Sequence, residues 1–306
     1  FKMSTHTLKI TSHVRAVVLA LVAIPVLFVA IAAVQARIDV LSGSVTQQKE
    51  ELVLRSGPML ENLSLGYGPL MADIYWTRAV QYFGNHMERR SHSFDLLAPL
   101  LDIATTLDPK LLIAYRFGAV FLAERPPGGA GRPDLAVDLV KKGIVNNPDE
   151  WHLNYDLGLL YYMRLKDYQK ASEAFLDGSK NPAAPGELMK IMAARVAENG
   201  ESLETSRLIW AELYNSTKDE SVRKRALFHV QALDAQMELK KLNESSEEYW
   251  KKFGRFPTSI QELRDAGLVQ GDLKDPAGYP YVMGPNGVPQ LDPHSLVPVE
   301  PNQQKP

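Results

Sequence analysis

A short residue pattern that recurs about four times between residues 70 and 218 limits the fold of this chain more than any other feature. Its clearest copy consists of Leu157, Gly158, Tyr161, Ala171, Phe175 and Pro182. Upstream copies consist of Phe117, Gly118, Phe121, Ala136, Val140, Gly143 and Pro148, and of Trp76, Ala79, Phe83, Leu97, Leu101, Ala104 and Pro109. A degenerate copy consists of Ala193, Ala194, Ala197, Gly200, Ser206, Trp210 and Leu213. Because one such unit cannot bury its own apolar face, the recurrence predicts an array in which each unit packs on the next.

The pattern resembles the tetratricopeptide (TPR) repeat, in which each unit is a pair of helices. The resemblance implies a mainly α-helical solenoid of about four helical hairpins over residues 70–218 and a role in binding other proteins. The clearest copy has one residue more than the family pattern between Tyr162 and Asp167. The preceding copy carries the insertion Pro126–Pro133, whose proline and glycine content cannot continue a helix. We interpret this insertion either as a contact loop on one edge of the array or as a tolerated change of loop length.

The same resemblance implies where a partner would bind. In TPR proteins the concave surface is lined by the first helix of each hairpin. The corresponding positions here are Thr77, Gln81, Tyr115, Ala119, His152, Tyr155, Tyr162 and Arg195. Tyrosine suits a binding groove because its ring gives a large contact area at low entropic cost and its hydroxyl adds a hydrogen bond. The alternative is that these rings pack between neighbouring repeats.

An uncharged apolar run over residues 16–36 predicts a transmembrane helix, since at 1.5 Å per residue it matches a bilayer core of about 30 Å. Lys2, Lys9 and Arg15 precede it, so the positive-inside rule places residues 1–15 in the cytoplasm and the rest of the chain on the other side. Small residues near the end of the run also fit a cleaved signal peptide, but its length favours an anchor. Residues 37–69 then form a stalk that leads to the repeats.

Composition excludes several classes of protein. The chain has 306 residues and a net charge of −2, which gives no basic excess for nucleic acid. It contains no cysteine, which excludes disulfides, thiolate-bound iron–sulfur clusters and covalently attached c-type haem. We therefore expect no cofactor.

Two further elements follow the repeats. Residues 219–253 predict a long helix that caps the array, with an apolar stripe of Ala226, Leu227, Val230, Leu233, Met237 and Leu242. Within residues 254–284, the sequences Gly-Arg-Phe-Pro from Gly254 and Asp-Pro-Ala-Gly-Tyr-Pro-Tyr from Asp275 resemble the carboxy-terminal part of type II secretion pseudopilins. Turns predict a small hairpin there, and six prolines over residues 285–306 predict an extended or disordered tail. Thr5 stands where pseudopilins have glutamate, so neither pilus assembly nor calcium binding is carried over.

Catalytic motifs are missing from the sequence. His86, Glu88 and His92 lie close together, but they lack the His-Glu-x-x-His spacing that aims two ligands from one helical face. No Gly-x-Ser-x-Gly elbow occurs either. We therefore expect no enzymatic activity, no catalytic residue and no metal site.

Taken whole, the chain resembles membrane-anchored TPR proteins of Acidobacteria and related bacteria. That resemblance implies a non-enzymatic scaffold in the bacterial cytoplasmic membrane, single-pass, with its repeats on the periplasmic side. It would serve as an accessory subunit of a larger respiratory, photosynthetic or secretory complex, with protein subunits and membrane lipid as its partners. The alternative is a membrane-anchored adaptor or chaperone that binds peptide segments of secreted or pilin-like clients.

Overall fold

The computed structural model describes residues 24–34, 37, 60, 64–271 and 273–297, and the chain divides into two compact units, residues 1–53 and 54–306. In the first unit, Ile24–Val34 is helical and its large apolar side chains are exposed. The rest of the predicted membrane span and stalk lies mostly outside the described residues. Within the described ranges, no helix combines the length and apolar character needed to cross a bilayer.

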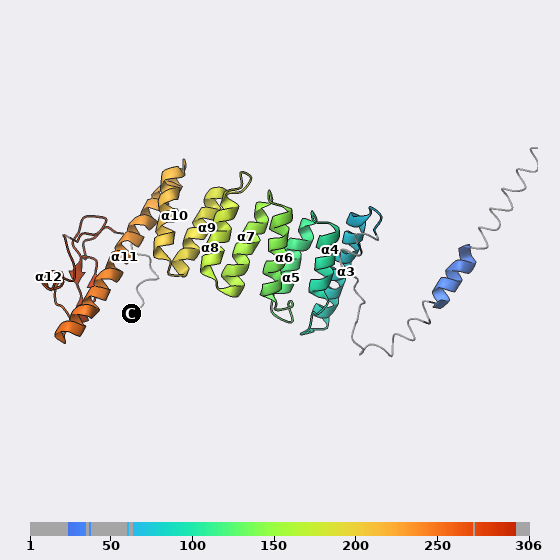
Figure 1. Cartoon of the computed structure of the whole chain (residues 1–306), viewed down its shortest axis with the longest axis horizontal. Coiled ribbons are helices and arrows are strands. Elements are labelled where there is room, and N and C mark those ends of the chain that lie inside the picture. The colour runs from blue at the N-terminus through green and yellow to red at the C-terminus, as the bar shows by residue number, and fades with distance from the viewer. Residues whose placement is uncertain (1–23, 35–36, 38–59, 61–63, 272, 298–306) are drawn as a thin grey trace, which may run out of the picture. The chain divides into compact units, whose positions relative to one another are not determined.

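The second unit is built almost entirely of helices, which confirms the prediction of a mainly α fold (Figure 1). The first part consists of α3 (Gly68–Glu88), α4 (Leu97–Leu107), α5 (Leu112–Ala123), α6 (Pro133–Asn146), α7 (Trp151–Leu159), η1 (Leu160–Leu165), α8 (Tyr168–Ser179), α9 (Gly186–Asn199) and α10 (Leu203–Ser216). The remainder consists of α11 (Glu220–Phe253), α12 (Ile260–Asp265), β1 (Val282–Met283), η2 (Pro285–Gly287) and β2 (Pro289–Gln290).

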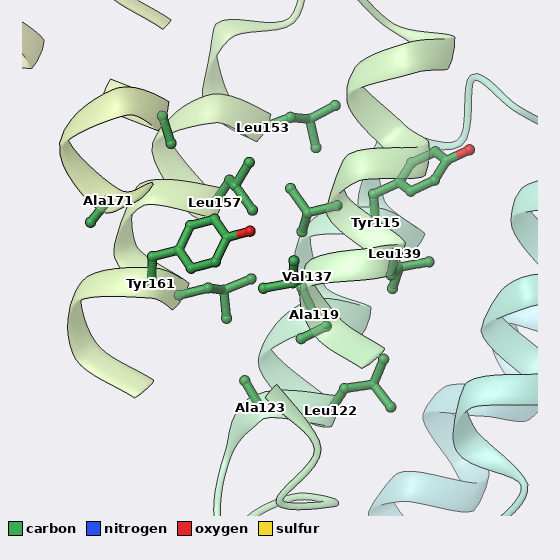
Figure 2. Close-up of a cluster of buried hydrophobic side chains, with 14 of the residues drawn as sticks. Tyr115, Ala119, Leu122, Ala123, Val137, Leu139, Leu153, Leu157, Tyr161 and Ala171 are labelled. Atoms are coloured by element: carbon green, nitrogen blue, oxygen red, sulfur yellow. The ribbon is translucent and has the colours of Figure 1, made fainter. Parts of the chain in front are cut away.

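Helices α3 to α11 pack in chain order, each against the next. One continuous apolar core runs through them, and Figure 2 shows the part formed by α5, α6, α7, η1 and α8. Leu122 and Leu153 are at most 2% exposed there. Burying a leucine of this kind contributes about 1.5–3 kcal/mol. The core therefore joins neighbouring helical pairs instead of closing within each pair.

Close approach of helices explains why glycine occupies its positions in the recurring pattern. A methyl carbon at Gly158 of α7 would lie 2.6 Å from Cε1 of Phe175 on α8. At Gly143 of α6 it would lie 2.9 Å from the ring of Tyr115 on α5. Only a residue without a side chain lets these aromatic rings lie against the facing helix.

The extra residue after Tyr162 is accommodated by a π-helix. Leu160–Leu165 adopts this wider turn at the end of α7, and Lys166 follows with a left-handed backbone, φ 57°. Asp167 then begins α8, its carboxylate accepting a hydrogen bond of 3.1 Å from the Lys170 amide. The pattern can therefore resume in register on α8, because π-bulges absorb single insertions within a helix.

The insertion between α5 and α6 is an ordered loop. Its backbone N–H groups at Ala130, Gly131 and Arg132 donate to the Phe121, Glu124 and Leu122 carbonyls at 2.9, 2.6 and 2.7 Å. The Phe121 and Leu122 carbonyls belong to the last turn of α5 and Glu124 follows it directly, where helical partners are missing. The loop thus serves as a cap for α5.

Helix α11 connects the repeats to a small carboxy-terminal cap. The carboxylate of Asp219 accepts hydrogen bonds from the Ser221 and Val222 amides, which starts the helix where the sequence predicts. Its first half packs on α10, and its second half carries Leu242 and Tyr249 into the separate apolar cluster of the cap. The predicted hairpin is present: β1 and β2 pair antiparallel.

The cap continues past Gly284, where the sequence places its end. Strand β2 lies beyond this point, and Leu291 packs against the apolar cluster of the cap. The Ser295 hydroxyl donates to the buried carboxylate of Asp275. The other oxygen of Asp275 accepts two backbone N–H bonds of 2.9 Å each. The prediction that the tail begins at residue 285 is therefore wrong, because residues up to Val297 complete the cap; residues 298–306 lie outside the described ones.

Candidate protein-interaction surface

Two ion pairs hold α5 beside α7 and η1. Arg116 Nε on α5 donates to Asp156 Oδ2 on α7 at 2.6 Å, and Arg164 on η1 pairs with Glu124 just after α5. In both pairs the partners are 40 residues apart in sequence, so equivalent positions of successive units face each other. The hydrogen bond with Asp156 raises the pKa of Arg116.

Aromatic contacts hold α3 on the other side of α5. The ring of Phe121 stacks on Phe83 with 3.9 Å between centroids, and it lies parallel to Trp76 at 6.1 Å. Helices α3, α5 and α7, with η1, therefore lie side by side. We call the surface that they share the first-helix face.

Helix α5 presents an exposed apolar stripe on this face. Ile113, Phe117 and Val120 are 45%, 55% and 52% exposed. At about 100° per residue, the side chains of these three residues point to one side of the helix, between the side chains of Arg116 and Phe121. We call these three residues the α5 stripe. It is bordered by Arg116–Asp156 and Glu124–Arg164, two pairs with no net charge, so an apolar strip lies within a polar rim.

Of the predicted groove residues, Tyr155 and Tyr162 are half-buried. Tyr155 lies edge-on to Phe175 with centroids 5.9 Å apart, within the unit's own packing. The Tyr162 hydroxyl accepts a hydrogen bond of 3.3 Å from Asn199 Nδ2 on α9, and Lys166 lies 5.7 Å from its ring. Each ring therefore packs against a neighbouring helix while part of it remains accessible, and a role for either tyrosine in binding stays a prediction.

His152 and Arg195 lie on the surface and make local contacts. The imidazole of His152 stacks on Trp151 at 3.7 Å and contacts Glu150, the residue that caps α7. Arg195 on α9 is exposed and lies 3.9 Å from Glu198. A role for either in binding stays a prediction.

Thr77 and Gln81 are exposed on α3, in agreement with their predicted positions at a surface. Together with Asp73, Ile74 and Arg78 they line a shallow hollow of about 320 Å³. A larger hollow of about 550 Å³ lies between α8, α9 and α10; its lining residues are Glu173, Leu176, Asp177, Ser179, Lys180, Lys190 and Glu212. Sequence patterns gave no signal for this second hollow, because its charged residues resemble any solvated helix surface.

The predicted placement of Tyr115 and Ala119 in an open groove is wrong. Tyr115 is fully buried and Ala119 is 2% exposed. The Tyr115 hydroxyl donates to the Thr105 carbonyl at 3.3 Å and accepts from Asn146 Nδ2 at 3.0 Å. Burial raises the pKa of this hydroxyl. Helix α5 is turned about its axis so that Tyr115 faces inward and Phe117 faces out.

The described part of the chain offers no cluster of metal ligands. Among those residues no group of at least three His, Asp or Glu side chains is arranged to hold a metal ion. Nδ1 of His86 lies 2.8 Å from the Tyr82 carbonyl oxygen and its ring packs on the Tyr82 ring, while His92 is exposed.

Comparisons with protein families, with curated proteins and with solved structures find no match for this chain.

Proposed function

We propose that this protein is a non-enzymatic TPR-type scaffold that binds a protein segment along its first-helix face. The observation that carries the proposal is the α5 stripe. Three large apolar side chains point away from the core although the opposite side of α5 is fully buried. Protein-interaction sites have this composition, an apolar centre within a rim of paired charges.

The geometry supports a partner segment that is itself apolar on one side. Ile113, Phe117 and Val120 rise along α5 at spacings of four and three residues, which favours an amphipathic helix or an extended segment laid along that helix. Arg116 and Glu124 beside the stripe are already paired with Asp156 and Arg164, so they would fix the position of a bound segment more than they would increase its affinity.

The proposal includes a membrane location. The uncharged run over residues 16–36, preceded by Lys2, Lys9 and Arg15, supports a single-pass anchor with the repeats on the extracytoplasmic side of a bacterial cytoplasmic membrane. The exposed apolar side chains of Ile24–Val34 are consistent with a helix that needs lipid or protein around it. In this arrangement the protein is an accessory subunit of a respiratory, photosynthetic or secretory complex.

A second candidate is an adaptor or chaperone that captures client peptides. It is favoured by the accessible parts of Tyr155 and Tyr162 and by the hollow beside Thr77. The two candidates differ in stoichiometry, since a subunit has one partner in constant ratio and an adaptor has many in small amounts.

The test is purification of the tagged full chain in mild detergent, with quantification of co-eluting proteins. Phe117→Ala with Val120→Ala should reduce recovery of the main partner by at least tenfold, because each removed side chain contributes about 1–2 kcal/mol when buried in an interface. The matched control is Val145→Ala with Leu208→Ala, which truncates apolar residues that are 80% and 65% exposed on α6 and α10. Equal recovery from all three proteins would reject the first-helix face as the binding surface.

A further inference from the structure

The end of α11 carries a cluster of exposed aromatic rings. Trp250, Phe253 and Phe256 are 49%, 50% and 42% exposed, and the rings of Trp250 and Phe256 stack with centroids 6.0 Å apart. This last turn of α11 lies at the far end of the helical row from α3 (Figure 1). These residues are therefore remote from the first-helix face.

The backbone fixes the cluster in its exposed position. Gly254 ends the helix with φ 72°, a conformation that favours glycine, and its amide donates to the Trp250 carbonyl at 2.8 Å. After this turn, Phe256 packs against Gly287. A methyl carbon added to Gly287 would lie 2.5 Å from Phe256 Cβ. The Ser246 hydroxyl holds the Gly287 carbonyl at 2.6 Å. The helix end, this packing and this hydrogen bond together hold the rings at the surface.

Folding of the cap does not require these rings to be exposed or aromatic. The apolar cluster of the cap is formed by Leu242, Tyr249, Leu263 and Tyr281, all at most 5% exposed. The three rings are about half exposed, so complete burial would add only roughly 1 kcal/mol for each of them. A surface that is rigid, aromatic and exposed is typical of a contact site.

The charges around the rings are mainly basic at the tip. Lys251 and Lys252 lie in the last turn, with Lys252 Nζ 5.5 Å from the centroid of the Phe253 ring. Arg255 is neutralised by Glu262, which it contacts at 2.8 Å. The nearest acids on α11 are Glu247 and Glu248, one helical turn before Lys251 and Lys252, or about 6 Å behind them along the axis at 1.5 Å rise per residue.

We propose that Trp250, Lys251, Lys252, Phe253 and Phe256, here called the aromatic tip, insert into the headgroup region of an anionic lipid bilayer. Tryptophan and phenylalanine with flanking lysines are the composition of membrane-surface contacts, in which rings enter the interface and ammonium groups reach lipid phosphates. A protein partner is less compatible, because lysine is depleted at the centres of protein interfaces. This inference is independent of what the first-helix face binds.

The experiment uses the lack of cysteine in the chain. Phe253→Cys in the full-length protein is labelled with nitrobenzoxadiazole and mixed with vesicles of two parts phosphatidylcholine to one part phosphatidylglycerol. We expect a blue shift of the emission and quenching by a headgroup spin-labelled lipid, with neither in pure phosphatidylcholine vesicles. The control is Ile113→Cys, equally labelled, on the α5 stripe; its emission should not respond to lipid quencher.

The charge contribution is tested by adding Lys251→Gln and Lys252→Gln to the labelled protein. The equilibrium constant for contact should fall about 30-fold, about fivefold for each lysine near an anionic surface. Absence of lipid quenching at position 253, or equal quenching at 113 and 253, would overturn the proposal. Protection of the label from aqueous iodide without lipid quenching would indicate a protein partner and would overturn it as well.

Discussion

Replacement of Gly158 by alanine tests the close packing of α7 on α8. An added methyl carbon would lie 2.6, 2.7 and 2.8 Å from three ring atoms of Phe175. Ordinary carbon–carbon contacts are about 3.5–4.0 Å, so the overlap is roughly 1 Å at three atoms. Phe175 is fully buried and cannot move into solvent.

The expected magnitude is the difference of two effects. Overpacking of a well-filled core costs about 1–3 kcal/mol, and overlap with three ring atoms places this site near the upper end. Alanine in a helix interior gains about 1 kcal/mol over glycine. Gly158→Ala should therefore lower the free energy of unfolding by about 2 kcal/mol, which corresponds to a melting temperature about 4–8 °C lower for a unit of this size.

Gly84→Ala on α3 is the matched control. Gly84 is helical and exposed, and no atom lies within 4 Å of the added carbon. This variant should raise the melting temperature by about 2–4 °C, since only the gain in helix propensity remains. Thermal unfolding of both variants is followed by circular dichroism at 222 nm, a wavelength that reports helix content. If Gly158→Ala stabilised the protein as much as Gly84→Ala, the close contact between α7 and Phe175 would be refuted.

Three further predictions concern polar contacts. A double-mutant cycle of Arg116→Ala and Asp156→Ala should give a coupling of about 0.5–1 kcal/mol that weakens with salt, as measured by urea unfolding, because the pair is partly exposed. Hydrogen bonds, first from Arg255, lower the pKa of Glu262 from 4.5 to about 2. The stability that Glu262 contributes should therefore be complete above pH 4.5 and disappear as the pH falls to about 2, and unfolding of Glu262→Gln should lack this component. Asp275→Asn should destabilise the cap by about 1–3 kcal/mol, seen as faster amide hydrogen exchange in residues 273–297. The amide oxygen can still accept the two backbone N–H bonds, but the amide nitrogen that replaces Oδ2 cannot accept the bond from the Ser295 hydroxyl.

Several elements could be predicted because local residues determine them. Asp219 begins α11 through its own side chain, and the turn at Asp275 follows from an acceptor placed before proline and glycine. In each case the signal lies within a few residues of the feature that it predicts.

The orientation of α5 could not be predicted in the same way. Its sequence is apolar on all sides, with Ile113, Phe117 and Val120 on one side and Ala114 and Leu122 on the other. Hydrophobic periodicity then gives no preference for the buried face, and packing against neighbouring helices decides it. The recurring pattern includes Phe117 among its apolar positions and takes Tyr115 and Ala119 as groove positions. For this reason the α5 stripe was missed and Tyr115 was placed at the surface.

Insertions were also ambiguous in the sequence. One additional residue after Tyr162 is compatible with a longer loop or with a wider helical turn, and the structure has the turn. The proline-rich stretch after residue 284 predicted an extended tail, but proline is also tolerated in an edge strand of a sheet. Pro289 occupies such a strand and residues up to Val297 pack on the cap.

The most direct test of the proposed interaction is site-specific photo-crosslinking in living cells. A photoreactive phenylalanine analogue replaces Phe117 on the first-helix face or, as a control, Val145 on α6, both of which are exposed. We expect one dominant cross-linked protein from position 117 and none of that protein from position 145. If position 117 gave no cross-link, or if both positions gave the same cross-linked proteins, a binding role for the first-helix face would be contradicted.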